Sequence, residues 1–428
     1  MMQLSRSEKM TWVTTIITVG FVAISIFYYR NGMFHKLAFP YNTFLPNPDY
    51  RFGDFYNTVG PWLQFEFKGV GFGFTYFPAT YLIVNIFKIL TVWWGADQGG
   101  IYIALLIFIA MFTAFIAVYT FINLRSPSFI ETIGRVVVIT FMTYPMLFVL
   151  HTGNFEMAVF VCVCLFVALY SGGHSTISTI PLGLAIAMKL VPAVFIVLFL
   201  ADRKFKDVLY LSMAVLLFTL LPLLIFSGGI LDGFAQYLAN FKASQKMYFD
   251  LMVIGIAGNH FGHSLLNAIR VVMGESFPPM DQIMKPYLAF AVVSFGFISA
   301  YIIFVERIFW KRVTLLVICM CLLPYTSGDY KLLHFLIPIF LLINHHTDDE
   351  VPDLRMDGVY ILLLTLLLVP KSYIYFHNYG INTLNSVLNA ALMEAVLLLI
   401  VWTGIVVNRD ILLKAFDRLI HPRKNGPG

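Results

Sequence analysis

Long apolar runs separated by short polar segments dominate the chain, and their lengths predict helices that span a membrane. A spanning helix needs about 20 consecutive apolar residues. Hydropathy predicts spanning helices at 12–29, 75–94, 101–123, 134–150, 155–171, 178–200, 208–226, 287–305, 313–324, 331–344, 358–370 and 391–408. Three of them, 313–324, 331–344 and 358–370, are shorter than a full span. The pattern therefore predicts an all-α, polytopic membrane bundle of about 12 spanning helices.

The composition agrees with this prediction and excludes several other classes. Of the 428 residues, 59% are apolar and 12% are charged, whereas soluble domains have about 45–50% and about 25%. A soluble enzyme, a disordered chain and a disulfide scaffold are excluded. The net charge of +5 is thinly spread, which excludes a nucleic-acid binder, because contact with DNA needs a basic face. We expect residues 1–428 to form a single integral-membrane domain.

Two features of the apolar runs have simple interpretations. The run Trp12–Tyr29 is too long for the core of a signal peptide and no small-residue cleavage site follows it, so we expect a first spanning helix. The cysteines form two C-x-C pairs inside apolar runs: Cys162, Cys164, Cys319 and Cys321. Residues two apart on a helix point to different sides and cannot chelate one metal ion. We expect buried core cysteines and no metal site.

Lysine and arginine in short loops give the orientation, because they accumulate on the cytoplasmic side. The twelve-helix count puts three basic segments on one side: 203–206, 307–312 and the tail 409–428. Both termini are then cytoplasmic. The segments predicted outside are 30–74, 227–286, 371–390 and a short break at 325–330.

The same count has one inconsistency. It places Arg125 and Arg135 outside, against the charge rule, so either that hairpin is irregular or the count is wrong by one helix there. It also places the polar turn His151–Glu156 inside, where we expect no catalytic role.

Most ionisable side chains fall in the predicted outer segments, among many aromatic residues. Aromatic faces can stack on sugar rings in a chamber at the interface, or form only the interfacial belt of a membrane protein, and both interpretations stay open. Asp54 follows Gly53 and precedes two aromatic residues. Partial desolvation would raise its basicity and suit it to take a proton from a hydroxyl; the alternative is a solvated acid in a loop.

Two further polar positions interrupt apolar runs. Lys189 lies inside a predicted spanning helix, three residues before Pro192. Such a lysine is either a ligand contact or a polar anchor, and the proline kinks the helix. Asp329, Tyr330 and Lys331 follow Pro324 at the start of another helix. They could bind an anionic headgroup with help from the helix dipole; a hydrated hairpin is the alternative.

Five short motifs between residues 50 and 340 occur in an order typical of one known family. They are Asp54-Phe55-Tyr56, Phe74-Thr75-Tyr76-Phe77-Pro78, Gly153-Asn154-Phe155-Glu156, Lys189-Leu190-Val191-Pro192, and Gly258-Asn259 with Ser264-Leu265. Together they resemble glycosyltransferase family 87, the polyprenyl-phosphate-mannose mannosyltransferases of the glycosyltransferase C type. The chain is also similar to phage and bacterial O-antigen glucosyltransferases in size and aromatic content.

The motifs depart from the family pattern at several positions. Phe77 replaces the first proline of F-[ST]-Y-P-P, and both polar positions of G-Q-x-N differ at Asn154 and Glu156. Lys331 and Leu332 stand where the family has a histidine pair. The contacts to the donor are therefore expected to differ from those of the family.

The resemblance implies a hexose transfer from a polyprenyl-phosphate donor to a glycan or lipid-linked glycan, with inversion and without a cofactor. It implies an active site facing the periplasm in a bacterial inner membrane, with glucose slightly favoured over mannose. Asp54 would be the catalytic base. We expect donor contacts from Lys331, Arg270, Lys189, Tyr330 and Asn259, and acceptor contacts from Tyr56, Asp329 and His260.

Two other functions are compatible with a multi-pass aromatic protein. An O-antigen polymerase would transfer a whole glycan, and the large outer segment 227–286 is compatible with it. The early acidic loop and the Lys189–Pro192 motif argue against it. A transporter of lipid-linked sugars would need charged residues along a path through the membrane, and Lys189 is the main candidate there.

Overall fold

The computed structural model describes residues 5–30, 51–63, 76–94, 98–225, 229–254, 262–345, 354–371, 375–377 and 381–407. The predicted site residues Asn259 and His260 lie outside these ranges. Within them the chain is helical apart from one antiparallel hairpin, β1 (Tyr375–His377) and β2 (Ile381–Thr383). The prediction of an all-α fold is confirmed.

The helices follow one another through short connections. The first group is α1 (Arg6–Arg30), α2 (Gly53–Leu63), α3 (Thr80–Trp93), α4 (Gln98–Asn123), α5 (Phe129–Val136), α6 (Tyr144–Thr152), α7 (Glu156–Ser171), α8 (Ser175–Met188) and α9 (Ile196–Ala201). The second is α10 (Phe205–Leu220), α11 (Gly229–Tyr248), α12 (Leu265–Met273), α13 (Met280–Phe304), α14 (Phe309–Leu322), α15 (Leu336–Ile343), α16 (Leu354–Leu368) and α17 (Asn385–Val407). The predicted outer segment 227–286 thus contains two helices, α11 and α12.

Two predicted single helices are each broken at a proline. Pro145 occupies the first turn of α6, after a π-helical segment Val137–Phe141, and the chain bends by 65° there. Pro192 has no N–H and would clash with the carbonyl four residues back. Helix α8 therefore ends at Met188, and a 3₁₀ segment, η3 (Val191–Phe195), follows an extended Lys189.

Five helices in the described ranges are long and apolar enough to cross a membrane, or six if the bent pair around Pro145 is one span. They are Ser7–Phe27, Gly100–Asn123, Phe205–Leu224, Met280–Phe304 and Asn385–Val407. The predicted count of twelve is not confirmed, because most other helices are too short. On α13, large apolar side chains such as Val292 and Phe297 are exposed, as expected of a helix that faces lipid.

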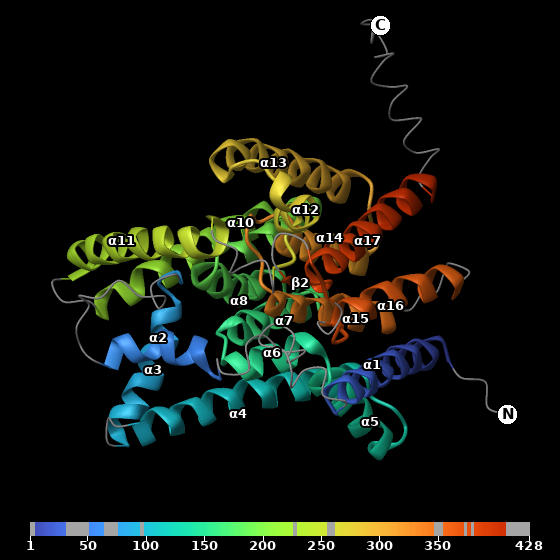
Figure 1. Cartoon of the computed structure of the whole chain (residues 1–428), viewed down its shortest axis with the longest axis horizontal. Helices are drawn as coiled ribbons and strands as arrows, with labels where there is room; N and C mark the ends of the chain where they lie inside the picture. The colour runs from blue at the N-terminus through green and yellow to red at the C-terminus, as the bar shows by residue number, and fades with distance from the viewer. Residues whose placement is uncertain are drawn as a thin grey trace, which may run out of the picture.

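The core of the bundle lies on α7 and α14, which are apolar on all sides and almost fully buried. A helix of this kind belongs at the centre of a large protein. The four cysteines lie on these two helices and are buried and free, as predicted: Cys162, Cys164, Cys319 and Cys321. Helix α8 packs along α7, and α10 packs along α8 (Figure 1).

One end of the bundle, which we call the basic end, collects the positively charged loops. The Nη1 atom of Arg312 pairs with Asp202 Oδ1 at 2.7 Å. Nδ2 of Asn344, just after α15, donates to the carbonyl oxygen of Asn123 at 3.0 Å. The end of α4 therefore lies beside the end of α15, and α14 and α15, joined through the turn at 323–328, both point their far ends here.

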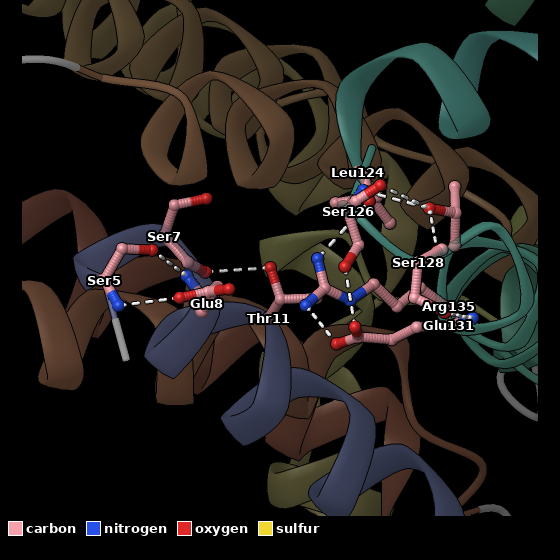
Figure 2. Close-up of polar contacts among 10 residues, drawn as sticks. Ser5, Ser7, Glu8, Thr11, Leu124, Ser126, Ser128, Glu131 and Arg135 are labelled. Atoms are coloured by element: carbon pink, nitrogen blue, oxygen red, sulfur yellow. Dashed lines mark hydrogen bonds and ion pairs between the residues drawn. The ribbon is translucent and has the colours of Figure 1, made fainter. Parts of the chain in front are cut away.

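The hairpin with Arg125 and Arg135 belongs to this basic end. Arg135 donates to the carbonyl of Leu124 at 3.4 Å and pairs with Glu131 at 2.5 Å (Figure 2). Leu124 is next to Asn123, which contacts Asn344. The prediction that both arginines lie outside is therefore wrong. The broken helix around Pro145 changes the count by one, and the charge rule is satisfied.

Helix α1 begins beside the same hairpin. Ser5 and Glu8 form a capping box, in which the Ser5 N–H donates to Glu8 Oε2 at 2.7 Å and the Glu8 N–H donates to Ser5 Oγ at 3.2 Å (Figure 2). This arrangement satisfies donors at the start of a helix. Glu8 also interacts electrostatically with Arg135. Helices α1 and α5 lie close together at one end of α4, and α2 and α3 lie at the other (Figure 1).

Candidate active site

Helix α2 is docked against the turn between α6 and α7. The Phe52 N–H donates to the His151 carbonyl at 2.7 Å. Phe52 has φ +55°, in the left-handed region that a bulky residue rarely adopts. This conformation turns the chain directly into α2, whose first turn contains Asp54. The half-buried Asp54 side chain thus starts a helix that is fixed to a distant part of the chain.

Gly153 makes this close approach possible. Its φ of +65° ends α6 in the left-handed conformation, and a Cβ added there would lie 2.9 Å from the Cβ of Phe55. Glycine is the residue that takes this conformation without strain and leaves room for the neighbouring backbone. The next residue, Asn154, donates from Nδ2 to Asp54 Oδ2 at 2.6 Å.

This contact corrects the predicted topology. The turn at residues 151–156 lies at the same end of the bundle as Asp54, opposite the basic end, and not on the cytoplasmic side as the helix count implied. Asn154 also accepts the Glu156 N–H at 2.8 Å through Oδ1. One asparagine side chain therefore connects the first outer segment to the start of α7.

Glu156 is completely buried and is paired on both oxygens. Oε2 lies 2.5 Å from Lys189 Nζ, and Oε1 lies 2.8 Å from His334 Nε2. The three residues come from α7, from the break after α8 and from the 3₁₀ segment η8 (Asp329–Phe335). A buried carboxylate needs such partners, because an unpaired buried charge is strongly destabilising.

Lys189 reaches Glu156 because the helix breaks at this residue. The ammonium also lies over the rings of Tyr76 and Tyr330, 5.0 and 4.8 Å from their centroids. Cation–π contacts of this kind hold a cation in a fixed place. The carbonyls left free at the end of α8 are satisfied by the segment before α3: the Phe77 N–H donates to Met188 at 3.2 Å.

Lys331 adds a second cation near the same carboxylate. Its side chain is buried, and it interacts electrostatically with Glu156 and Lys189. Among the described residues, no hydrogen bond or ion pair satisfies the Lys331 ammonium. A buried ammonium without such a partner is costly, so this position favours an anionic ligand.

A second buried cluster fixes the chain just before Lys331. Asp329 accepts from Tyr144 through Oδ2 at 3.0 Å, and its Oδ1 lies 2.9 Å from His263 Nδ1. The other ring nitrogen of His263 lies 3.1 Å from Ser327 Oγ. The backbone is paired here too, since the His263 N–H donates to the Ser327 carbonyl at 2.9 Å.

Burial lowers the pKa of His263 and outweighs the attraction of Asp329. The imidazole is therefore neutral at pH 7, with Nδ1–H donating to Asp329 and Nε2 accepting from Ser327. Burial also lowers the pKa of Lys371, another neighbour of Asp329, to about 7. Tyr330, which follows Asp329, has a raised pKa because of burial and of the nearby carboxylates Glu156 and Asp54.

The structure brings together four of the predicted site residues: Asp54, Lys189, Tyr330 and Lys331. Tyr56 lies on α2 beside them and is exposed. Asp329 lies behind them, fully buried. Arg270 lies apart from Lys189 on α12, and its guanidinium donates to the carbonyls of Val253 and Ile254.

Several residues that the sequence did not single out as site residues belong to the cluster: Asn154, Glu156, His263, His334, Tyr76 and Tyr144. The polar turn around Glu156 was visible as a motif, but its expected side was wrong. His334 lies inside an apolar run, and a histidine there is a signal of a buried polar contact. In the described ranges no group of three or more His, Cys, Asp or Glu side chains is arranged to hold a metal ion.

The arrangement combines a half-buried carboxylate with two cations over a buried counter-ion. Such a site can take a proton from a hydroxyl on one side and stabilise negative charge on the other. A comparison with family models matches glycosyltransferase family 87 over residues 74–325, which is more than half of the 428 residues. The chain belongs to glycosyltransferase family 87.

This family 87 protein is therefore a membrane glycosyltransferase. The matched stretch contains the Asn154–Glu156 turn and Lys189, whereas Asp54 and Lys331 lie outside it. No curated protein and no solved structure matches the chain.

Proposed function

We propose that this glycosyltransferase moves a hexose from a polyprenyl-phosphate donor to a glycan or glycolipid acceptor at the outer face of the bacterial inner membrane. The observation that carries the proposal is the continuous contact from Asp54 through Asn154 to Glu156 and its two lysines. It combines a base and a phosphate-binding site in one cluster, at the end of the bundle away from the cytoplasmic loops.

Asp54 is the proposed base. Its half-buried position leaves it accessible to an acceptor, while the hydrogen bond from Asn154 fixes its orientation. In the proposed step the acceptor oxygen attacks the anomeric carbon and its proton passes to Asp54. The bond from that carbon to the phosphate oxygen breaks and its electron pair stays on the phosphate. In-line attack inverts the anomeric centre.

Lys189 and Lys331 are the proposed phosphate contacts. Lys189 is held by Glu156 and two tyrosine rings, and Lys331 has no compensating partner among the described residues. A lipid phosphate is already a good leaving group, so fixed cations that steady its charge are sufficient. Tyr330, which lies against Lys189, would contact the donor sugar or phosphate.

The other predicted residues have different roles in this proposal. Arg270 is engaged by two backbone carbonyls and supports the segment 249–254. Asp329 has both oxygens engaged, so it positions Tyr330 and Lys331 and does not bind the acceptor directly. Tyr56, exposed on α2, remains the proposed acceptor contact, and Asn259 and His260 stay predictions from the sequence.

A panel of donors tests the proposal. Purified protein in lipid nanodiscs is given polyprenyl-phosphate-glucose, polyprenyl-phosphate-mannose or a polyprenyl-diphosphate-linked glycan, with extracted bacterial glycolipids as acceptor. We expect release of polyprenyl phosphate and a hexose added to the acceptor, faster with glucose. Transfer only from the diphosphate donor would instead indicate a polymerase, and movement of intact donor across the bilayer without cleavage would indicate a transporter.

A further inference from the structure

Glu156 is a charged residue for which the proposed reaction has no direct use. It is fully buried, and both of its oxygens are occupied by Lys189 and His334. It therefore cannot act as the base, and it cannot touch the sugar or the acceptor. Its position between the two cations gives it electrostatic influence on whatever those cations bind.

The phosphate gains negative charge during the proposed reaction. The donor is a phosphodiester with one negative charge. The product is a phosphate monoester, whose second ionisation near pH 6 gives it about −1.5 to −2 at pH 7. The breaking bond leaves its electron pair on the phosphate oxygen, while the acceptor proton goes to Asp54.

A site with two unbalanced lysines would hold this product more tightly than the donor and release it slowly. Glu156 cancels one of the two positive charges, so that Lys189, Lys331 and Glu156 together carry +1. That sum matches the charge of the donor and is less than the charge of the product. Resting on the proposed function, we propose that Glu156 is a positioning residue that sets the relative affinity for product and donor and thereby speeds product release.

The test compares wild-type protein with Glu156→Gln, which keeps size and hydrogen bonding but removes the charge. The readouts are the dissociation constants for polyprenyl phosphate and for polyprenyl-phosphate-glucose. We expect the affinity for product relative to donor to rise by roughly 10- to 100-fold, the effect of one-half to one extra charge at about 6 Å with an effective dielectric constant of about 20. Turnover should then show a pre-steady-state burst.

Two controls separate this role from a structural one. Glu156→Asp keeps the charge and should restore a ratio close to that of the wild type. Asp202→Asn breaks another carboxylate–cation pair, with Arg312 at the basic end, and should leave the ratio unchanged. A Glu156→Gln protein in which both affinities change equally would overturn the inference.

Lys331→Met gives an independent test with the opposite sign. It removes one cation and leaves both contacts of Glu156 in place, so it serves even if Glu156→Gln does not fold. The product should then lose more affinity than the donor, by at least about tenfold; an unchanged ratio would contradict the inference. If wild-type protein does not cleave any polyprenyl-phosphate hexose, the proposed function fails instead.

Discussion

Replacing Gly153 by alanine tests how Asp54 is positioned. Gly153 has φ +65°, and a Cβ added there would lie 2.9 Å from the Cβ of Phe55, in the first turn of α2. Ordinary van der Waals contacts of such atoms lie at 3.4–4 Å. Either the turn or α2 must therefore move by about half an ångström or more, and Asp54 moves with α2.

The size of the effect follows from two terms. The left-handed conformation costs a residue with a Cβ about 1–2 kcal/mol, and relieving the contact adds to it. We expect the free energy of unfolding to fall by about 1–3 kcal/mol. Because a misplacement of about 1 Å in a catalytic group can lower a rate about 100-fold, we expect turnover to fall by roughly 10- to 100-fold.

The assay measures thermal unfolding in detergent and the initial rate of polyprenyl phosphate release. Gly134→Ala is the matched control, because Gly134 lies in helix α5 and an added Cβ meets no atom within 4 Å. That variant should keep full activity and gain up to about 1 kcal/mol in stability. A Gly153→Ala protein with normal stability and normal turnover would refute the docking of α2 on this turn.

Two further predictions concern the topology and the segment before Lys331. The native cysteines are buried, so single cysteines at Arg125, Arg203 and Glu275, which are exposed, should report sidedness: an impermeant thiol reagent applied to intact cells should label only position 275. Labelling at 125 but not 203 would contradict the common basic end. Asp329→Asn should lower the free energy of unfolding by about 1–3 kcal/mol and raise KM for the donor, because Tyr144 and His263 lose their shared acceptor; an unchanged KM would show that this cluster does not position Lys331.

The long apolar runs predicted the helices well, because burial in a bilayer demands about 20 apolar residues in one stretch. The sequence reasoning failed where a run contained a proline. The run 134–150 contains Pro145, and the run 178–200 contains Pro192. Hydropathy does not register that proline removes a backbone donor, so it joined segments that the chain keeps separate. The wrong side for the turn at 151–156 followed from the first of these errors.

For the site, single residues could be chosen from the sequence but their partners could not. Asp54 and Lys189 were recognisable because each is a charge in an unusual place. The partner of Lys189, Glu156, is 33 residues away, and its second partner, His334, is 178 residues from it. Contacts over such separations depend on how the helices pack. The motif around Asn154 carried the information, but only the contact with Asp54 shows which end of the bundle it belongs to.

The most direct test of the account is the turnover of Asp54→Asn, measured as release of polyprenyl phosphate from saturating polyprenyl-phosphate-glucose. The substitution keeps the size of the side chain and removes its basicity. We expect kcat to fall by about 10²–10⁴-fold, while the dissociation constant for the donor stays within about threefold of wild type. Asp232→Asn, an exposed carboxylate on α11, should leave both values unchanged. A kcat for Asp54→Asn close to that of wild type would contradict the assignment of Asp54 as the base.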